Sequence, residues 1–370
     1  MTKPENSVNT SRRKAEHVEL CLGEQVSFQE VQSGFESLRF KHLAVPEVNH
    51  DSVSLETIFL ERKLNRPFMI SSMTGGYEAA EKINRYFALF AETQNIPLGV
   101  GSMRQTLESE KYKESYSVLR KAAPNAMIFA NIGAPEVAGK MGVKEIRRII
   151  DLIRADALII HLNAVQELFQ PEGNTAFFGL LSKIEGLAKS IPEPIIAKEV
   201  GNGISAKAAK RLMDSGVKVI DVAGSGGTNW QRVEAIRYQG TFGEDRRFSP
   251  EARRELLEWG MSTAECLMEI KSLKAIKPDY QGIEIIASGG IRNGLDVAKS
   301  IALGATLAAA ATPFLKCIFR KGTNDLLDET GALNALHQLL TTWENDLRAA
   351  MFLTGSAGIS DLHKAELQSL

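Results

Sequence analysis

The sequence predicts an α/β fold: a (β/α)8 TIM barrel with an N-terminal extension, an insertion between strands 6 and 7, and C-terminal helices. Eight short apolar runs follow one another, most of them roughly thirty residues apart, which is the spacing of strand–helix units. Nearly every run is followed by a segment rich in glycine or in polar and charged side chains. This is expected where active-site groups gather at the carboxyl ends of barrel strands. The runs are 67–73, 96–100, 126–131, 157–162, 194–200, 217–223, 284–289 and 306–311.

Residues 1–66 precede the first strand, and we expect them to form an arm and a cover for the barrel. A helix is predicted from Ser11, because apolar residues such as Val18 and Leu22 recur at helical spacing. The segment from Phe40 to Leu60 is typical of short extended pieces broken by turn residues.

The barrel is predicted over residues 67–320, and amphipathic segments between its strands mark the crossover helices. Gly216 and Gly304 directly follow two of these segments, where a glycine commonly ends a helix. The segments are 79–94, 143–154, 176–190, 206–215 and 295–303.

The gap between the sixth and seventh strands is unusually long, from residue 229 to residue 282. It contains a charged segment, 240–247, and a helix-like stretch from Pro250 onward. Because long loops in compact enzymes are commonly functional, we interpret 229–282 as an insertion or lid. Residues 321–370 should form C-terminal helices, with two helices between Asp325 and Ala350 that pack outside the barrel.

The composition excludes several classes of protein. The chain has 370 residues, 44% hydrophobic and 24% charged, with a formal net charge of −1, so no global charge favours nucleic acid or a membrane surface. Cys21, Cys266 and Cys317 lie far apart, which argues against a disulfide framework or a zinc site. The N-terminus has no apolar signal-peptide core, and no apolar stretch is long enough to span a bilayer. We therefore expect a cytoplasmic protein.

A phosphate site is predicted where the last two strands end. Ser288-Gly289-Gly290 follows the seventh strand, and Thr312-Pro313 follows Ala310-Ala311 of the eighth. In barrels these two loops commonly hold a phosphate with backbone N–H groups, and glycine allows a close approach of the backbone. Tight turns alone would also explain one glycine pair, but two adjacent loops in this position favour the phosphate site.

Lys198 ends the fifth strand, in an otherwise apolar run. A lysine there must point inward and find an anion, because an unpaired buried ammonium is costly. Beside a flavin it can face the N1/O2 edge, where negative charge builds on reduction. A Schiff-base lysine and a buried ion pair with a carboxylate such as Glu199 are the alternatives.

The tail of the fourth strand carries four functional side chains within seven residues: His161, Asn163, Gln166 and Glu167. Glu167 can supply one oxygen to Mg²⁺, which takes few protein carboxylates and completes its shell with phosphates and water. The amides of Asn163 and Gln166 can donate hydrogen bonds to the phosphate group that binds this Mg²⁺. Arg104, after the second strand, is a further candidate ligand for that anion. A lone histidine is more often structural than catalytic, so His161 alone does not establish a site.

Taken together, these residues resemble the type 2 isopentenyl-diphosphate delta-isomerase family. The similarity spans residues 12 to about 316 and rests on many motifs in one order. The matching elements are Arg13–His17, Ser72–Gly76, Gly101–Arg104, Asn131–Gly133, Gln166–Glu167, Gln170–Gly173, Lys198–Gly201, Asp221–Gly224, Gly227–Thr228 and Ala287–Gly294.

The resemblance implies a barrel that binds FMN, requires Mg²⁺ and a reduced flavin, usually supplied by NADPH, and interconverts isopentenyl and dimethylallyl diphosphate without net redox change. It implies flavin contacts from Ser72, Met73, Thr74, Ser102, Asn131, Lys198, Thr228, Gly289, Gly290, Ala310 and Ala311. It implies substrate contacts from Arg13, Lys14, Ser102, Met103, Arg104, Asn163 and Gln166, with His161 and Gln166 as catalytic side chains and Glu167 on Mg²⁺. The basic arm at 12–17 would by this resemblance reach a neighbouring barrel, in a homotetramer or homooctamer.

The isomerisation must protonate one carbon and deprotonate another in a dry pocket. The strand tails offer no paired carboxylates for this, so the hypothesis is that reduced FMN itself carries the proton. The main alternative is an FMN-dependent oxidoreductase of the 2-hydroxy-acid oxidase type. Such enzymes resemble one another in a His-Gly-Gly tail near the sixth strand, where this chain has Gly224-Ser225-Gly226-Gly227. An inosine-monophosphate-dehydrogenase-like enzyme would need a cysteine in that loop, and a non-catalytic flavin- or phosphate-binding protein is the third alternative.

Overall fold

The structure is a computed structural model that describes residues 3–23, 26–139 and 141–370, with side chains from residue 11 onward. Eight parallel strands close into a barrel in the order β10-β11-β4-β5-β6-β7-β8-β9, which confirms the predicted fold. Seven of the eight apolar runs contain one barrel strand each, and β6 extends two residues beyond the end of the run 126–131. The strands are β4 Phe68–Ile70, β5 Leu98–Gly99, β6 Ile128–Gly133, β7 Ala157–Leu162, β8 Ile195–Glu199, β9 Val219–Asp221, β10 Glu284–Ala287 and β11 Leu307–Ala310.

The register of the parallel strands aligns several functional residues at one level of the barrel. Gly133 of β6 is paired with His161 of β7, and His161 with Lys198 of β8. Lys198 is in turn paired with Asp221 of β9. All four lie at or next to the carboxyl ends of their strands, so one turn around the barrel gathers them at the same rim.

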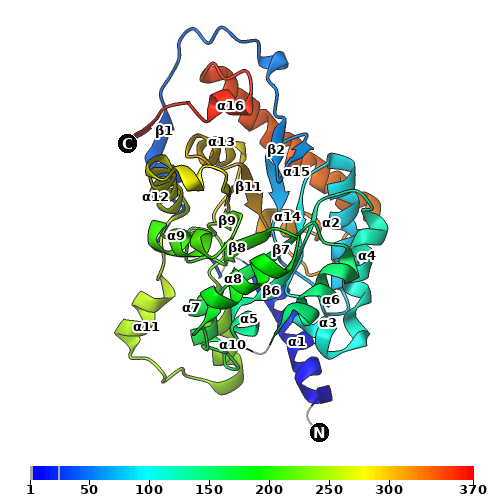
Figure 1. Cartoon of the computed structure of the whole chain (residues 1–370). Helices are drawn as coiled ribbons and strands as arrows, with labels where there is room; N and C mark the ends of the chain where they lie inside the picture. The colour runs from blue at the N-terminus through cyan, green and yellow to red at the C-terminus, as the bar shows by residue number, and fades with distance from the viewer. Residues whose placement is uncertain (1–2, 24–25, 140) are drawn as a thin grey trace.

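A ring of helices surrounds the barrel (Figure 1). The predicted crossover segments all contain a helix, and Gly216 follows α9 with a φ of 91°, as expected for a helix-ending glycine. The helices that follow the strands in the ring are α2 Ala80–Gln94, α4 Glu114–Ala122, α6 Val143–Ile153, α8 Leu180–Ser190, α9 Ala206–Asp214, α12 Thr263–Ile276 and α13 Gly294–Ala302.

The C-terminal region differs from its prediction. One helix, α15 (Glu329–Leu353), replaces the two expected between Asp325 and Ala350. Leu336, Leu340 and Leu347 keep a helical spacing of buried positions, and no glycine or proline interrupts them. Because α15 packs against both α13 and α2, it occupies the eighth position of the ring and does not form a separate outer layer. A short helix, α16 (Ile359–Leu362), follows it.

The long segment between β9 and β10 contains one helix of the barrel ring as well as additional helices; its role as a lid stays a prediction. Its last helix, α12, packs against α9 and serves as the sixth crossover helix of the barrel. The additional part consists of α10 (Trp230–Phe242) and α11 (Pro250–Leu257), the second of which begins where the sequence predicted. The division of the chain at residues 66 and 320 stays a prediction.

Further short helices stand at the carboxyl ends of the strands. In Figure 1, α3, α5, α7 and α10 lie at the lower end of the molecule, opposite α16. These short helices are α3 Arg104–Glu108, α5 Ala134–Ala138, α7 Ala164–Phe169 and α14 Thr312–Cys317.

The N-terminal arm is a long helix, α1 (Lys3–Leu22), which begins eight residues before the predicted start at Ser11. It contacts α3, α10 and α14 and so lies across the carboxyl end of its own barrel. The resemblance had implied that the arm reaches a neighbouring barrel. The helix is instead seated in cis, because Val18 and Cys21 are buried in the core of the same chain.

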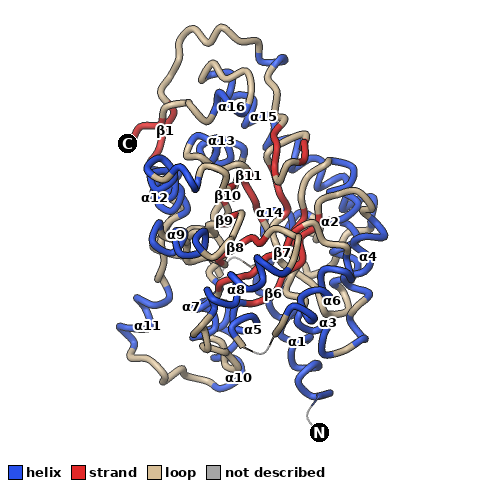
Figure 2. The backbone as a smooth tube through the Cα atoms, viewed as in Figure 1, coloured by secondary structure: helices blue, strands red, loops and turns tan. Residues whose placement is uncertain are grey.

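Two small sheets complete the fold (Figure 2). Near the ends of the chain, β1 (Leu38–Phe40) pairs antiparallel with β12 (Leu367–Ser369). The hairpin of β2 (Thr57–Phe59) and β3 (Arg62–Leu64) places Phe59 and Leu64 in the apolar cluster inside the barrel. This hairpin therefore closes the amino-terminal end of the barrel and leaves the carboxyl end for a site.

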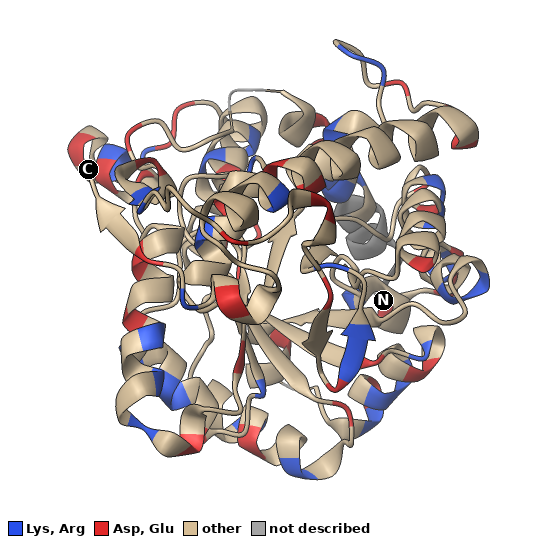
Figure 3. Ribbon diagram, turned by 90° about the horizontal axis from the view of Figure 1, so that it is seen from above, with Lys and Arg blue, Asp and Glu red and all other residues tan. Residues whose placement is uncertain are grey.

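Basic and acidic residues lie interspersed over the outer helices (Figure 3), in keeping with the formal net charge of −1. Within the described ranges, every helix is too short or too polar to cross a lipid bilayer.

Candidate functional site

A cavity of about 490 Å³ opens at the carboxyl end of the barrel, within the range of cofactor and ligand sites. Nearly all the residues predicted for the site line it. The predicted residues in its wall are Arg13, Lys14, Ser72, Met73, Ser102, Arg104, Asn131, His161, Asn163, Gln166, Glu167, Lys198, Thr228, Gly289, Gly290, Ala310 and Ala311.

Two predicted residues lie behind the wall of this cavity. Met103 is fully buried in the apolar core, and its backbone N–H donates to the carbonyl of Asn131. Thr74 is buried as well, and its carbonyl accepts the N–H of Gly101. Both residues tie strand tails together and contribute no surface to the cavity.

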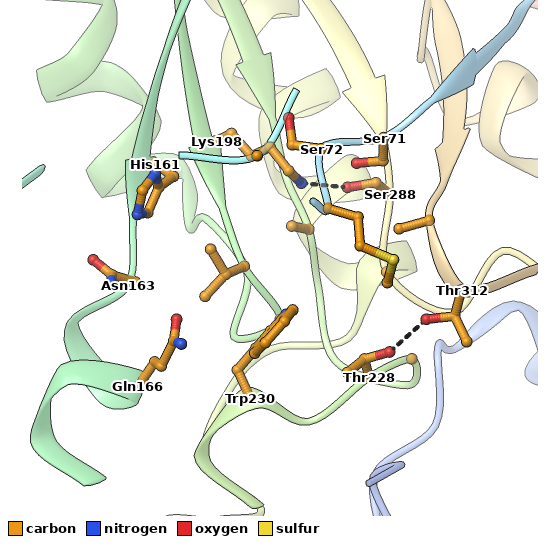
Figure 4. A pocket seen from close by; sticks show the side chains of 18 of the residues that line it. Ser71, Ser72, His161, Asn163, Gln166, Lys198, Thr228, Trp230, Ser288 and Thr312 are labelled. Carbon is orange, nitrogen blue, oxygen red and sulfur yellow. Dashed lines mark hydrogen bonds between the residues drawn. The ribbon is translucent and has the colours of Figure 1, made fainter. Parts of the chain in front are cut away.

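Lys198 finds its anion on the neighbouring strand β9. Its Nζ lies 3.1 Å from Oδ2 of Asp221. The same Nζ lies 3.3 Å from Oγ of Ser288 (Figure 4). Ser288 donates its hydroxyl to Oδ1 of Asp221 at 2.5 Å. Glu199, the partner considered from the sequence, instead accepts the backbone N–H groups of residues 200–202. Asp221 thus holds the lysine from behind the cavity wall.

His161 is held in one tautomer. The amide nitrogen of Asn131 donates to the carbonyl of Val100, so the Asn131 oxygen faces Nδ1 of His161 at 2.7 Å. Nδ1 must therefore carry the proton, which leaves Nε2 as an acceptor. Burial lowers the pKa of His161 to about 4, although Glu136 acts in the opposite direction. At neutral pH His161 is an uncharged hydrogen-bonding group.

Three cations gather at the mouth of the cavity. Arg13 pairs with Glu172 at 3.2 Å, and Arg104 pairs with Glu136 at 2.8 Å. Lys14 donates to two neutral oxygens, the carbonyl of Ser102 at 2.8 Å and the hydroxyl of Tyr116 at 3.0 Å. Burial, with Arg13 and Arg104 nearby, lowers the pKa of Lys14 well below its usual value. An anionic ligand at this mouth would relieve the repulsion among the three cations.

Glu167 is the predicted metal ligand and lies near these cations. It accepts from the amide of Asn163 at 2.7 Å and from the backbone N–H of Asn174 at 2.6 Å. Burial raises the pKa of Glu167, and these two hydrogen bonds partly offset that effect. Across the described residues, no group of three metal-ligating His, Cys, Asp or Glu side chains occurs. A Mg²⁺ ion here would need oxygens from a ligand to complete its shell.

Gln166 is oriented by a buried carboxylate. Oε1 of Glu234 lies 3.0 Å from Nε2 of Gln166 and 2.9 Å from Nε2 of His17. Burial alone would raise the pKa of Glu234, but His17, Arg237 and the Gln166 amide together lower it to about 2. An ionised carboxylate only accepts hydrogen bonds, so Gln166 turns its NH₂ toward Glu234. Its carbonyl oxygen is the end left to face the cavity.

The glycine-rich loops pack more closely than other residues allow. A Cβ on Gly289 would lie 2.0 Å from the carbonyl oxygen of Gly224, and its φ is 95°. A Cβ on Gly227 would lie 2.6 Å from the backbone nitrogen of Gly290. Beside them, the hydroxyls of Thr228 and Thr312 lie 2.8 Å apart (Figure 4). Backbone and hydroxyl groups thus form this end of the cavity, which suits a phosphate.

The polar atoms of the cavity, both donors and acceptors, fit FMN and a bound anion. Oγ of Ser72 is buried and has no hydrogen-bond partner among the described residues, so it can bond to a flavin. Oδ1 of Asn163 and Nε of Arg13 are buried and unpaired in the same way, on the side of the cavity that carries the cations. Lys198 lines the same cavity and contacts Ser288 of the glycine-rich loop, so it can offer a positive charge to the polar edge of a flavin ring.

Several lining residues were not predicted as site residues. His17 and Trp230 stack edge to face at 5.2 Å and close one side of the cavity. Glu136 also lines it, and Glu234 and Asp221 act from behind. The Arg13–His17 motif contains His17, and the Asp221–Gly224 motif contains Asp221 at the end of β9. Glu136, Trp230 and Glu234 belong to helices and stand in none of the quoted motifs.

Comparison with known proteins places this site in a class. The FMN-dependent dehydrogenase family matches residues 159–369, more than half of the chain. A mandelate oxidase mutant superposes with a TM-score of 0.60 over 99% of this chain and 100% of its own, at 15% identity. A flavocytochrome b2 mutant with benzoylformate superposes with a TM-score of 0.65 over 94% of this chain and 79% of its own, at 16% identity. The chain is therefore an FMN-dependent barrel protein, and the two superpositions establish the fold alone.

Closer relatives define the family. The isopentenyl-diphosphate delta-isomerase of Chlorobium phaeobacteroides is 53% identical over 97% of this chain and 95% of its own. The protein of the same name from Pelodictyon phaeoclathratiforme is 52% identical over 98% of this chain and 98% of its own. The one from Nostoc sp. is 43% identical over 99% of this chain and 98% of its own. The chain belongs to the type 2 isopentenyl-diphosphate delta-isomerase family, which confirms the resemblance noted in the sequence.

Proposed function

We propose that this protein interconverts isopentenyl diphosphate and dimethylallyl diphosphate, with reduced FMN, Mg²⁺ on the diphosphate and no net redox change. The observation that carries this proposal is the group of three cations beside a cavity suited to flavin. Family membership supports the same substrates, since the relatives are named for that reaction.

The diphosphate is assigned to Arg13, Lys14 and Arg104, with Asn163 and Gln166 beside them. Lys14 supports this assignment most directly, because its hydrogen-bond acceptors are neutral and leave its charge for the ligand. Glu167 would hold Mg²⁺ through one oxygen, with diphosphate oxygens and water as the other ligands. The cations and the metal together neutralise the charge that anchors the substrate.

FMN would supply, when bound and reduced, the acid–base group of the isomerisation. His161 is uncharged at neutral pH, so its part is to accept a hydrogen bond at Nε2. Gln166 presents a carbonyl oxygen to the substrate. Trp230 and His17 exclude water from the reacting carbons on one side. NADPH is the proposed source of the reducing equivalents.

The FMN-dependent oxidoreductase alternative lacks its catalytic base. The loop after β9 lines the cavity with Ala223, Gly226, Gly227 and Thr228, where the oxidase-type tail needs a histidine. The two histidines that line the cavity, His17 and His161, come from the arm and from β7. Neither histidine follows the sixth strand, so the isomerase is the better-supported function.

The test is an anaerobic incubation of the protein with FMN, NADPH, Mg²⁺ and labelled isopentenyl diphosphate. Dimethylallyl diphosphate should form over many turnovers for each flavin reduced. Flavin reduction without isomer would exclude the proposed substrate while leaving the flavin site intact. Replacing FMN with 5-deaza-FMN should abolish turnover, and full activity with that analogue would rule out the role assigned to the flavin.

We also propose that the protein works in the cytoplasm as a homotetramer or homooctamer. Light scattering on a sizing column gives the mass directly. A monomer at all concentrations would exclude this assembly without affecting the isomerase.

A further inference from the structure

Tyr116 lies outside the cavity wall and touches three of the segments that build it. It belongs to α4 and is completely buried. Its hydroxyl donates to the carbonyl of Ser102, after β5, at 2.5 Å and accepts from Lys14 of the arm at 3.0 Å. Its ring stands against Gly75, after β4, where a Cβ would lie 2.4 Å from the ring. One side chain thus connects the arm to two strand tails.

The contacts of Lys14 are unusual among the three cations at the mouth. Arg13 has Glu172, and Arg104 has Glu136 and Glu108, within ion-pair distance. For Lys14, no carboxylate lies within that distance among the described residues, and its two acceptors are a carbonyl and a phenol. Holding an ammonium with neutral oxygens fixes its position without cancelling its charge.

The donor count of Lys14 leaves one position for a ligand. An ammonium has three N–H groups, and the Ser102 carbonyl and the Tyr116 hydroxyl take two of them. Because Lys14 lines the cavity, the third is available there. The Tyr116 hydroxyl donates its hydrogen bond to the Ser102 carbonyl, so a lone pair of its oxygen is left to accept from Lys14. The ring of Tyr116 adds to this hold, since Nζ lies 5.7 Å from its centroid.

We propose that Tyr116 is a positioning residue that seats Lys14 with its charge unpaired, ready for the diphosphate of the substrate. This inference rests on the proposed function for the identity of the ligand. The central claim is that Tyr116 positions a lysine that binds a diphosphate. Binding of inorganic pyrophosphate tests this claim without any need for turnover.

The first experiment compares the wild-type holoenzyme with Tyr116→Phe, which keeps the ring and removes the hydroxyl. We expect pyrophosphate to bind about tenfold more weakly, as for one lost hydrogen bond to a charged group, with FMN affinity and the flavin spectrum unchanged. The KM for isopentenyl diphosphate should rise by a similar factor, and kcat should change less than twofold. Tyr112→Phe is the matched control, because Tyr112 is half-buried beside Lys111, lies outside the cavity wall and should leave pyrophosphate affinity unchanged.

A double-mutant cycle with Lys14→Ala separates positioning from general loosening of the fold. If Tyr116 acts through Lys14, adding Tyr116→Phe to Lys14→Ala should cause little further loss of pyrophosphate affinity. The pH at which pyrophosphate binding declines should also move to lower values in Tyr116→Phe, because the ammonium has lost an acceptor.

Unchanged pyrophosphate affinity in Tyr116→Phe, or equal losses with and without Lys14, would overturn the proposal. Absence of isomerisation by the wild type, with pyrophosphate affinity that depends on Tyr116, would instead count against the proposed substrate alone.

Discussion

The Nζ of Lys198 lies 3.1 Å from Oδ2 of Asp221, on the next strand of the barrel and in register with it. Asp221 is completely buried, and the Lys198 side chain is 8% exposed, so solvent screens this ion pair little. Lys198 lines the cavity while Asp221 does not. The carboxylate therefore sets where the ammonium stands without itself meeting a ligand.

Asp221→Asn should destabilise the protein and alter the bound flavin. Removing one partner of a buried pair leaves an uncompensated charge, and the expected loss in the free energy of unfolding is about 3–5 kcal/mol. The unpaired Lys198 would favour negative charge on a nearby reduced flavin, so the midpoint potential should rise. Urea denaturation and dye-linked flavin reduction measure the two effects. Ser288→Ala, which keeps the ion pair, should cost less stability, and an equal cost would contradict this account.

Glu234→Gln should lower kcat through Gln166. An ionised Glu234 accepts from Gln166 and His17 at once, whereas a glutamine there can also donate and allows the Gln166 amide to turn over. Misplacement of a group at the reacting centre typically costs about 10²-fold in rate. Steady-state kinetics at saturating Mg²⁺ and substrate give kcat. Glu244→Gln, an exposed change on the same segment, is the control. Wild-type kcat in Glu234→Gln would show that Gln166 needs no such orientation.

Gly289→Ala should abolish flavin binding while the chain still folds. The added Cβ would lie 2.0 Å from the carbonyl oxygen of Gly224, at a φ of 95° that a side chain rarely adopts. The loops after β9 and β10 would have to separate, and the phosphate end of the cavity would lose its shape. Flavin content after purification is the measurement. Gly240→Ala, where nothing lies within 4 Å of the new Cβ, should retain full flavin.

Glu167→Gln should raise the Mg²⁺ concentration needed for activity. The change removes the charged oxygen assigned to the metal but keeps the size of the side chain. We expect half-saturation at about tenfold or more higher Mg²⁺, with FMN affinity unchanged. Because burial raises the pKa of Glu167, the wild type should also need more Mg²⁺ as the pH falls. Glu185→Gln on α8 is the exposed control. The same Mg²⁺ dependence in both variants would exclude Glu167 as the ligand.

The barrel could be predicted because its signals are local. Each strand is a short apolar run, because a parallel strand that is buried on both faces consists almost entirely of apolar residues. The functional tails follow from the same logic, so His161 and Lys198 could be placed at one rim. The single C-terminal helix was harder to predict. The buried leucines from Leu336 to Leu347 keep a helical spacing, but only the packing of α15 against α2 and α13 shows that no turn divides it.

The residues that orient the site could not be predicted in this way. Asp221 sits in an apolar run, and Tyr116 and Glu234 sit on helices outside the strand tails. Their roles depend on which atoms meet between different elements of the fold, as Gln166 and Glu234 do across 68 residues of chain. The position of the N-terminal arm also depends on long-range contacts. The family resemblance alone therefore predicted that the arm reaches a neighbouring barrel.

His161 should make the flavin-free protein less stable as the pH falls. Its folded-state pKa of about 4 lies below the ordinary value near 6.5, so between these values the unfolded chain binds a proton that the folded chain does not. Stability is therefore fully present above about pH 6.5 and is lost toward pH 4, by at most about 1.4 kcal/mol per pH unit.

The measurement is urea denaturation of the flavin-free wild type and His161→Gln at closely spaced pH values. Every other titrating group, including Glu234, is shared by the two proteins, so the difference between their curves isolates His161. The wild-type free energy of unfolding should fall more steeply between pH 6.5 and 4, and the two curves should run parallel above that range. Curves that stay parallel throughout would mean that the cavity hydrates the ring enough to keep its ordinary pKa.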